Sequence, residues 1–369
     1  MKKMLLLALC LCTAFSFPAF GAETKALRIV TTIFPEYDWV REITGDTGAE
    51  ITLLLDNGVD LHSYQPTVQD MVKIANCDLF IYVGGESDEW VERALKNAVN
   101  KNQVTINLLD TLGDSVKNEE LVEGMEHGHH HDHDHDHDHD HDHDHDHDHD
   151  DDHDHDHDHD HDHDHDHDHD HDHDHDHDDD HDHGHHHHDE EEADEHVWLS
   201  LRNVEVICRS IAQTLSVLDP VHKETYAANA ARYTEKLSSL DKAYQDVVRG
   251  AARKVFLFGD RFPFRYLADD YGLKYYAAFS GCSAESEASF ETVMFLAGKV
   301  DELGLPCVMT IEGTQHKIAE TVIANTKAKN QKVLIMDSMQ STTSKEIENG
   351  VSYLSVMERN LETLKAALN

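Results

Sequence analysis

The sequence predicts an α/β protein in which two lobes with parallel sheets are joined by one long rigid helix, with a disordered His/Asp-rich insert. Segments with strand-like and helix-like patterns alternate on both sides of the insert, which is typical of βαβ units. A single apolar face runs along residues 220–250. Residues 127–188 consist only of His, Asp and Gly, a composition that cannot bury a core.

Before the insert, apolar runs rich in β-branched residues alternate with segments of helical spacing. The expected strands are residues 27–34, 51–55, 79–83 and 104–108, and the expected helices are 37–43, 68–75 and 90–99. Short strands separated by helices favour a parallel sheet, because each crossover helix returns the chain to the same edge.

The second half repeats this alternation. Strands are expected at 255–258, 275–279, 307–311 and 333–336, and helices near Tyr266 and at 290–300, 318–326 and 351–368. The predicted organisation is therefore a leader at 1–21, an N-terminal lobe at 22–126, the insert at 127–188, the end of the N-terminal lobe at 189–219, a connecting helix at 220–250 and a C-terminal lobe at 251–369.

The connecting helix is predicted from one uninterrupted pattern. Pro220 stands in the first turn, and the next glycine or proline is Gly250. Apolar side chains between them recur at alternating spacings of four and three: Tyr226, Ala230, Tyr233, Leu237, Leu240, Tyr244 and Val247. About thirty helical residues span ~45 Å. Such a helix would act as a stiff strut that restricts hinge motion between the lobes.

The first 21 residues have the pattern of a secretory signal peptide. Lys2 and Lys3 precede an apolar run at 4–20 that ends in a small-x-small cleavage pattern near Gly21. Cys10 and Cys12 lie inside this leader, which disfavours a lipid-anchored cysteine. We therefore expect a mature protein in the periplasm without a lipid anchor.

Most of the net charge of −45 belongs to the insert, where 32 histidines alternate with 28 aspartates. Such an acidic chain disfavours nucleic acid as a partner. Imidazoles suit Zn, Cu and Ni, so the tract predicts many weak, exchanging metal sites. Consecutive histidines mark its two ends: His129, His130, His131, His185, His186, His187 and His188. A linker without a metal role and a pH sensor are the alternatives.

Only four histidines lie outside the tract, and two of them are placed for a site. His62 follows the second expected strand, where ligands bind in α/β lobes. His196 directly follows the acidic flank of the insert. His222 is expected in the first turn of the connecting helix and His316 at the entry of another helix. His62 and His196 are therefore the candidate metal ligands.

Four cysteines follow the leader: Cys77, Cys208, Cys282 and Cys307. An oxidising compartment permits disulfides, and Cys282 with Cys307 is the preferred pair because both lie in the same half. Cys77 and Cys208 are expected to be small buried apolar residues. The sequence contains no paired-cysteine zinc spacing.

Three motifs carry a resemblance to a known family. They are the opening Thr31–Pro35, the loop Gly58–Thr67 and the segment His196–Ser200. Together they resemble the zinc/manganese group of ABC-transporter substrate-binding proteins, most closely the periplasmic zinc-uptake proteins with a His-rich loop. The resemblance covers essentially the whole mature chain. It implies a two-lobed binder that holds one ion in its cleft, with His62 and His196 as ligands.

The third ligand departs from the family pattern. The family has a Ser-His-Asp motif after the first strand of the second lobe, and alignment on Tyr271-Gly272-Leu273 places Arg261 at the expected histidine. Arginine stays cationic and cannot ligate a metal. Either Asp260, a water or a tract histidine replaces it, or the site in this lobe is altered. The resemblance also implies an acidic ligand at Asp337 and an acidic cleft position at Glu312. Arg261 pairing with Asp337 would remove that oxygen from the metal.

The predicted function is capture of Zn²⁺ and its delivery to the membrane permease of an ABC metal importer by a monomeric carrier. Two imidazoles with carboxylate oxygens suit tetrahedral zinc, and an oxygen-richer site also tolerates Mn²⁺. A manganese carrier and a metal buffer or sensor are the alternatives. An enzyme is not expected: no HExxH, GxSxG or phosphate-loop motif supports a zinc hydrolase.

Overall fold

The computed structural model describes residues 26–126, 192–283, 287–313 and 315–369. These residues belong to one structural unit. The predicted leader at 1–21 and the His/Asp tract at 127–188, with its candidate ligands His129, His130, His131, His185, His186, His187 and His188, lie outside the described residues.

The first half forms one parallel sheet. Its strands are β1 (Arg28–Thr31), β2 (Glu50–Leu53), β3 (Leu79–Tyr82) and β4 (Val104–Asn107), in the order β2-β1-β3-β4. The helices are α1 (Phe34–Thr44), α2 (Val68–Asn76), α3 (Trp90–Lys96) and α4 (Leu108–Leu112). All neighbouring strands are parallel, so the loops that follow them meet at one edge of the sheet. This confirms the predicted alternation.

The second half is also parallel, but its strands are shorter and paired two by two. The strands are β5 (Val255–Leu257), β6 (Arg261–Phe262), β7 (Lys274–Tyr276), β8 (Phe279–Ser280), β9 (Cys307–Ile311) and β10 (Lys332–Met336). β5 pairs with β7, β6 with β8 and β9 with β10. The single strand expected at 275–279 is divided into β7 and β8, because three residues of the partner segment, 258–260, stand opposite two, 277–278, between the paired registers.

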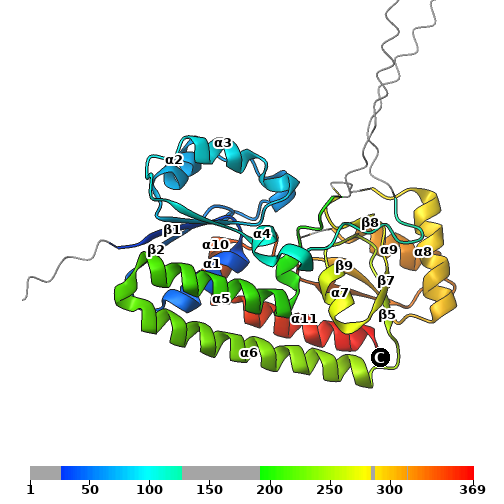
Figure 1. The fold of residues 1–369 in the computed structure, drawn as a ribbon. Helices are drawn as coiled ribbons and strands as arrows, with labels where there is room; N and C mark the ends of the chain where they lie inside the picture. Colours follow the sequence, from blue (N-terminus) through cyan, green and yellow to red (C-terminus); the bar gives the residue numbers. More distant parts are fainter. Residues whose placement is uncertain (1–25, 127–191, 284–286, 314) are drawn as a thin grey trace, which may run out of the picture. The chain divides into compact units, whose positions relative to one another are not determined.

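Four helices of the second half flank these strands (Figure 1): α7 (Arg265–Tyr271), α8 (Phe290–Leu303), α9 (Lys317–Asn325) and α11 (Tyr353–Ala367). The short helix α10 (Ser344–Glu348) lies beside the first half instead, where Thr343 forms a β-bridge with Asn57. A β-bridge between Phe258 and Met309 links the strand pairs β5-β7 and β9-β10. The loops after β8 and β10 are the ones that carry site residues.

A long helix, α6 (Lys223–Gly250), follows a short 3₁₀ turn at Pro220–His222 and runs beneath elements of both halves (Figure 1). It contacts α1 of the first half and α7 and α11 of the second. Its buried face is the predicted one, except that Val248 replaces Val247: Tyr226, Ala230, Tyr233, Leu237, Leu240, Tyr244 and Val248. The helix α5 (Leu201–Leu218), which packs along α6, is absent from the predicted elements.

The predicted disulfide between Cys282 and Cys307 is wrong, because both cysteines are free. Cys307 is the first residue of β9 and is buried in the hydrophobic core, whereas Cys282 follows the end of β8. The two residues therefore lie toward opposite ends of the parallel strands. Cys77 and Cys208 are buried, as predicted. Among the described helices, none is long and apolar enough to cross a membrane.

Candidate metal centre

His62 lies in a short 3₁₀ turn, Leu61–Ser63, that follows β2 and the loop after it. Asp60 begins this turn by accepting the His62 N–H through Oδ1 at 3.0 Å. The Nδ1 atom of His62 lies 2.8 Å from the Ser87 hydroxyl and 3.5 Å from Glu195 Oε2. Partners at Nδ1 fix the ring and leave Nε2 directed away from them.

His196 is fully buried and directly precedes a second 3₁₀ turn, Val197–Leu199. Asp194 Oδ1 accepts the His196 N–H at 2.9 Å and also lies 2.9 Å from its Nδ1. The turn is held in place by Trp198, whose Nε1–H donates to the Ser338 carbonyl at 2.8 Å. Tyr353 donates its hydroxyl to the Trp198 carbonyl at 2.7 Å. A carboxylate behind an imidazole is the usual second partner of a metal-binding histidine.

The structure brings the two predicted histidines together. Their Nε2 atoms are 3.2 Å apart and their ring centroids 5.2 Å apart. Burial, His196 and Arg261 lower the pKa of His62 well below its ordinary value, so its ring is neutral and keeps a lone pair. Two imidazole nitrogens on one tetrahedral Zn²⁺ at ~2.0–2.1 Å would be separated by about 3.3 Å. The observed separation fits one shared ion.

A sulfur atom joins the two imidazoles. Ligand atoms of His62, His196 and Cys282 all lie within 4.8 Å of one another. The loop that carries Cys282 packs directly on His196: a Cβ added at Gly281 would lie 2.9 Å from Cε1 and 3.0 Å from Nδ1 of that ring. The Cys282 N–H donates to Glu119 Oε1 at 2.9 Å, which fixes the loop at this position. The sequence predicts a disulfide for this cysteine and not a place beside the two histidines.

Gln340, in the loop after β10, contacts both imidazoles. Its Nε2 contacts Nε2 of His196 and lies 3.3 Å from Nε2 of His62. Its Oε1 is buried without a hydrogen-bond partner among the described residues. Rotation of the amide would present this oxygen to the imidazoles.

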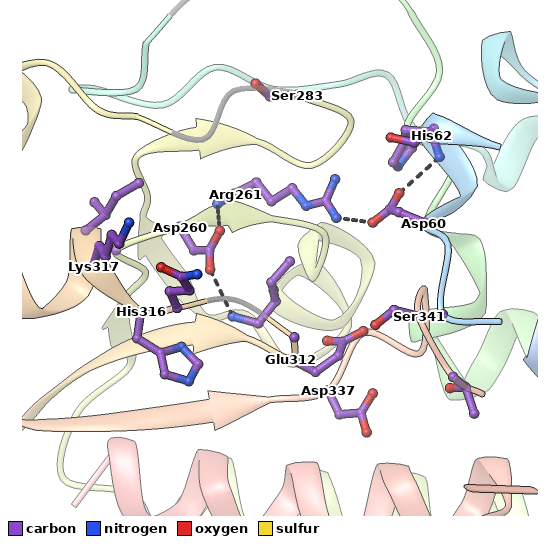
Figure 2. A pocket seen from close by; sticks show the side chains of 18 of the residues that line it. Asp60, His62, Asp260, Arg261, Ser283, Glu312, His316, Lys317, Asp337 and Ser341 are labelled. Carbon is purple, nitrogen blue, oxygen red and sulfur yellow. Dashed lines mark hydrogen bonds and ion pairs between the residues drawn. The ribbon is translucent and has the colours of Figure 1, made fainter. Parts of the chain in front are cut away.

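Arg261 does not pair with Asp337. Its guanidinium binds the carboxylate of Asp60, and Figure 2 shows the side chain extended across the cavity toward Asp60 and His62. The Asp260 carboxylate accepts the Thr310 hydroxyl at 2.6 Å and the Arg261 N–H at 2.9 Å. Asp260 therefore stabilises the strand ends, and Arg261 adds a cation beside His62.

Glu312 and Asp337 lie in another part of the same cavity, which has a volume of about 970 Å³ (Figure 2). Glu312 accepts the Ser338 N–H at 2.6 Å, the Ser338 hydroxyl at 2.8 Å and the Gln340 N–H at 3.2 Å. Asp337 accepts the Met339 N–H at 2.9 Å and faces Arg359 at 3.5 Å. Neither belongs to the three-ligand group, so metal ligation by Asp337 stays a prediction.

His316 and His222 stand apart from the group. His316 directly precedes α9 and its Nδ1 lies 3.2 Å from the Thr310 hydroxyl. His222 ends the 3₁₀ turn before α6, where its Nδ1 lies 2.6 Å from Asp219 Oδ2. Both positions are the helix entries that the sequence predicts.

Comparison with known proteins identifies the family of this chain. Residues 29–367 match the family model described as zinc-uptake complex component A, periplasmic, ZnuA. The chain belongs to this family. Family membership confirms the predicted resemblance, and the coarse fold is shared with solved structures of relatives.

Two curated relatives illustrate the range of similarity. The zinc-binding lipoprotein AdcA of Streptococcus pneumoniae is 31% identical over 99% of this chain, and the chain spans 61% of the length of that relative. The high-affinity zinc uptake system protein ZnuA of Bacillus subtilis is 27% identical, with 94% of this chain and 90% of the relative covered.

Among solved structures, the Zn(II)-bound ZnuA-like domain of S. pneumoniae AdcA aligns with a TM-score of 0.62 at 27% identity, over 93% of this chain and 99% of that domain. The periplasmic zinc-binding protein TroA from Treponema pallidum aligns with a TM-score of 0.64 at 18% identity and shows the fold alone. Both have the two-lobed arrangement with parallel sheets and a long helix that the sequence predicts.

Proposed function

We propose that this chain is an extracytoplasmic carrier that captures one Zn²⁺ between His62 and His196 and delivers it to the permease of an ABC importer. The observation that carries the proposal is the 3.2 Å separation of the two Nε2 atoms. Ser87 lies at Nδ1 of His62 and Asp194 lies at Nδ1 of His196, so the Nε2 atom of each ring is left for a shared ion. Buried neutral imidazoles in this arrangement suit a borderline-soft cation.

The names of the relatives support zinc as the cargo and uptake as the process. AdcA is named as zinc-binding and the B. subtilis relative as part of a zinc uptake system. The same family supports a binding protein in transport rather than an enzyme. The AdcA relative is named as a lipoprotein, so it gives no support to the predicted absence of a lipid anchor.

The His/Asp tract has a supporting role in this proposal. It raises the local concentration of the ion through weak sites, and the centre at His62 and His196 binds one ion tightly. His196 lies a few residues beyond the tract, so an ion released by the tract meets it first. The number of ions that the tract can bind should decrease as the pH drops below about 6.5, because protonated imidazoles cannot bind a metal.

Isothermal titration calorimetry with zinc tests the proposal. His62→Ala and His196→Ala, each in the full chain and in a variant lacking residues 127–188, should lose the tightest step. Removing a group that hydrogen-bonds to a metal ligand typically weakens metal binding 10–100-fold. Loss of a ligand itself should therefore weaken zinc binding by more than about 100-fold. His222→Ala is the control, because this histidine pairs with Asp219.

Two outcomes would contradict the proposal. A tract-deleted chain without any tight site would show that the tract is the main binding element. Unchanged tight binding after both histidine substitutions would favour a buffer or sensor whose lobes only display the tract.

A further inference from the structure

Cys282 stands in the position that a third metal ligand needs, and the proposed function does not use it. We propose that the Sγ atom of Cys282 ligates the cation held by His62 and His196, in place of the histidine that the family resemblance implies at Arg261. This inference rests on the proposed function and specifies its ligand set. It assigns the cargo to the thiophilic divalent cations, Zn²⁺ and its chemical analogue Co²⁺.

The first argument is distance. The three ligand atoms already lie within 4.8 Å of one another. On a tetrahedral zinc, a sulfur at ~2.3 Å and a nitrogen at ~2.0–2.1 Å would be about 3.6 Å apart. The difference of at most ~1 Å is within the reach of rotation about the single χ angle of cysteine.

The second argument is the construction of the loop. Gly281 has no side chain at the point where any Cβ would collide with the His196 ring and with the Phe262 carbonyl. The Cys282 N–H bond to Glu119 then holds the next residue beside that ring. This close approach brings Cys282 to the imidazoles, whereas Cys77, Cys208 and Cys307 are buried within the hydrophobic core cluster.

The third argument is that the charged side chains around Arg261 and in the loop after β10 are already engaged. Arg261 is bound to Asp60, and Asp260 accepts hydrogen bonds from Thr310 and from the Arg261 N–H. Glu312 and Asp337 bind backbone N–H groups of the loop after β10. The thiol is therefore the group best placed to complete the pair of imidazoles.

Ligation has a defined proton balance. The S–H bond of Cys282 breaks, a sulfur–metal bond forms, and one proton leaves to solvent for each ion bound. No oxidant or reductant takes part. A thiolate also selects against hard cations, because manganese prefers oxygen ligands and zinc accepts sulfur and nitrogen.

Titration of the full chain with Co²⁺ tests the inference directly. A cobalt–thiolate bond gives a charge-transfer absorption in the near ultraviolet, whereas imidazole and carboxylate ligands do not. The His/Asp tract contains no sulfur, so its bound cobalt cannot contribute to this band. We expect the band in the wild type and in Cys307→Ser, and its loss in Cys282→Ser.

Zinc binding provides the second readout. Cys282→Ser should weaken the tightest calorimetric step by more than about 100-fold, while Cys282→His, which restores an imidazole, should recover tight binding without the cobalt band. Circular dichroism of each metal-free variant establishes that it is folded. A Cys282→Ser variant that does not fold is replaced in the comparison by Cys282→His, whose retained band would by itself overturn the inference.

The outcomes separate this inference from the proposed function. Loss of tight binding in His62→Ala, together with no cobalt band in the wild type or unchanged affinity in Cys282→Ser, would overturn the thiolate ligand and leave the carrier intact. Unchanged tight binding in both histidine variants would reject the carrier proposal itself.

Discussion

Two groups of polar side chains, both with members that line the cavity, are satisfied in different ways. The imidazole–thiol group, His62, His196 and Cys282, brings nitrogen and sulfur atoms close to one another. The carboxylate pair, Glu312 and Asp337, accepts hydrogen bonds from the loop after β10. Cys282, Glu312 and Asp337 follow the ends of parallel strands, where ligands usually bind.

The difference indicates which group is reserved for a ligand. Buried polar atoms are normally paired, and the two imidazole Nε2 atoms share a single amide, that of Gln340. The carboxylate pair accepts several N–H and O–H donors and therefore holds the loop that presents Gln340. We infer that the imidazole–thiol group binds the ion and that the carboxylate pair supports it.

Among substitutions that leave the proposed ligands in place, the largest effect is expected from Asp194, which lies at Nδ1 of His196. Asp194→Ala removes the acceptor at 2.9 Å from Nδ1 and should weaken tight zinc binding 10–100-fold, because such partners fix ring orientation. Calorimetry on tract-deleted protein measures this effect. Asp219→Ala, which removes the Nδ1 partner of His222, is the matched control and should leave the affinity within about threefold. Equal losses in both variants would show that the effect does not come from the orientation of His196.

A smaller effect is expected on stability from the carboxylate pair. Glu312→Ala leaves the Ser338 N–H, the Ser338 hydroxyl and the Gln340 N–H without their acceptor. The loss should be about 1–2 kcal/mol, because the cost of unpaired donors is partly offset by removing a buried charge. Urea denaturation of metal-free protein measures it. Glu348→Ala, on the exposed end of α10, is the control, and an equal change there would contradict the assignment.

The sequence predicts most of the fold because the signals are local. Strands such as β3 and helices such as α6 carry their own apolar periodicity, so their neighbours are not needed to find them. The strand at 275–279 is divided because the segment that pairs with it has one extra residue, which no pattern within that strand reveals. α5 does carry helical spacing, with Leu201, Val204, Ile211 and Leu215 buried on one face, so this helix was within reach of the same reasoning.

The candidate site was predictable only in part, because its members are far apart in the chain. His62 and His196 are conspicuous as two of four histidines outside the tract. Cys282 and Gln340 become neighbours of these rings only through the packing of the loops after β8 and β10. One signal was available: Cys282 follows the end of a strand, which is where ligands gather.

The smallest effect concerns the pH dependence of stability. Burial, together with the charge of Asp337, raises the pKa of Glu312, and burial raises that of Asp337. At a pH above the ordinary pKa of a carboxyl group, the folded chain therefore binds more protons than the unfolded chain. The free energy of unfolding then falls as the pH rises toward the raised pKa values. Asp337→Asn removes one charge while its carbonyl oxygen can still accept the Met339 N–H.

We expect this variant to lose stability less steeply between pH 5 and pH 8, by a fraction of the ~1.4 kcal/mol per pH unit that one proton contributes. Urea denaturation of metal-free protein at several pH values measures the slope. Glu348→Gln, an exposed carboxylate, should leave the slope unchanged. A slope identical to the wild type in Asp337→Asn would mean that the two carboxylates do not repel each other.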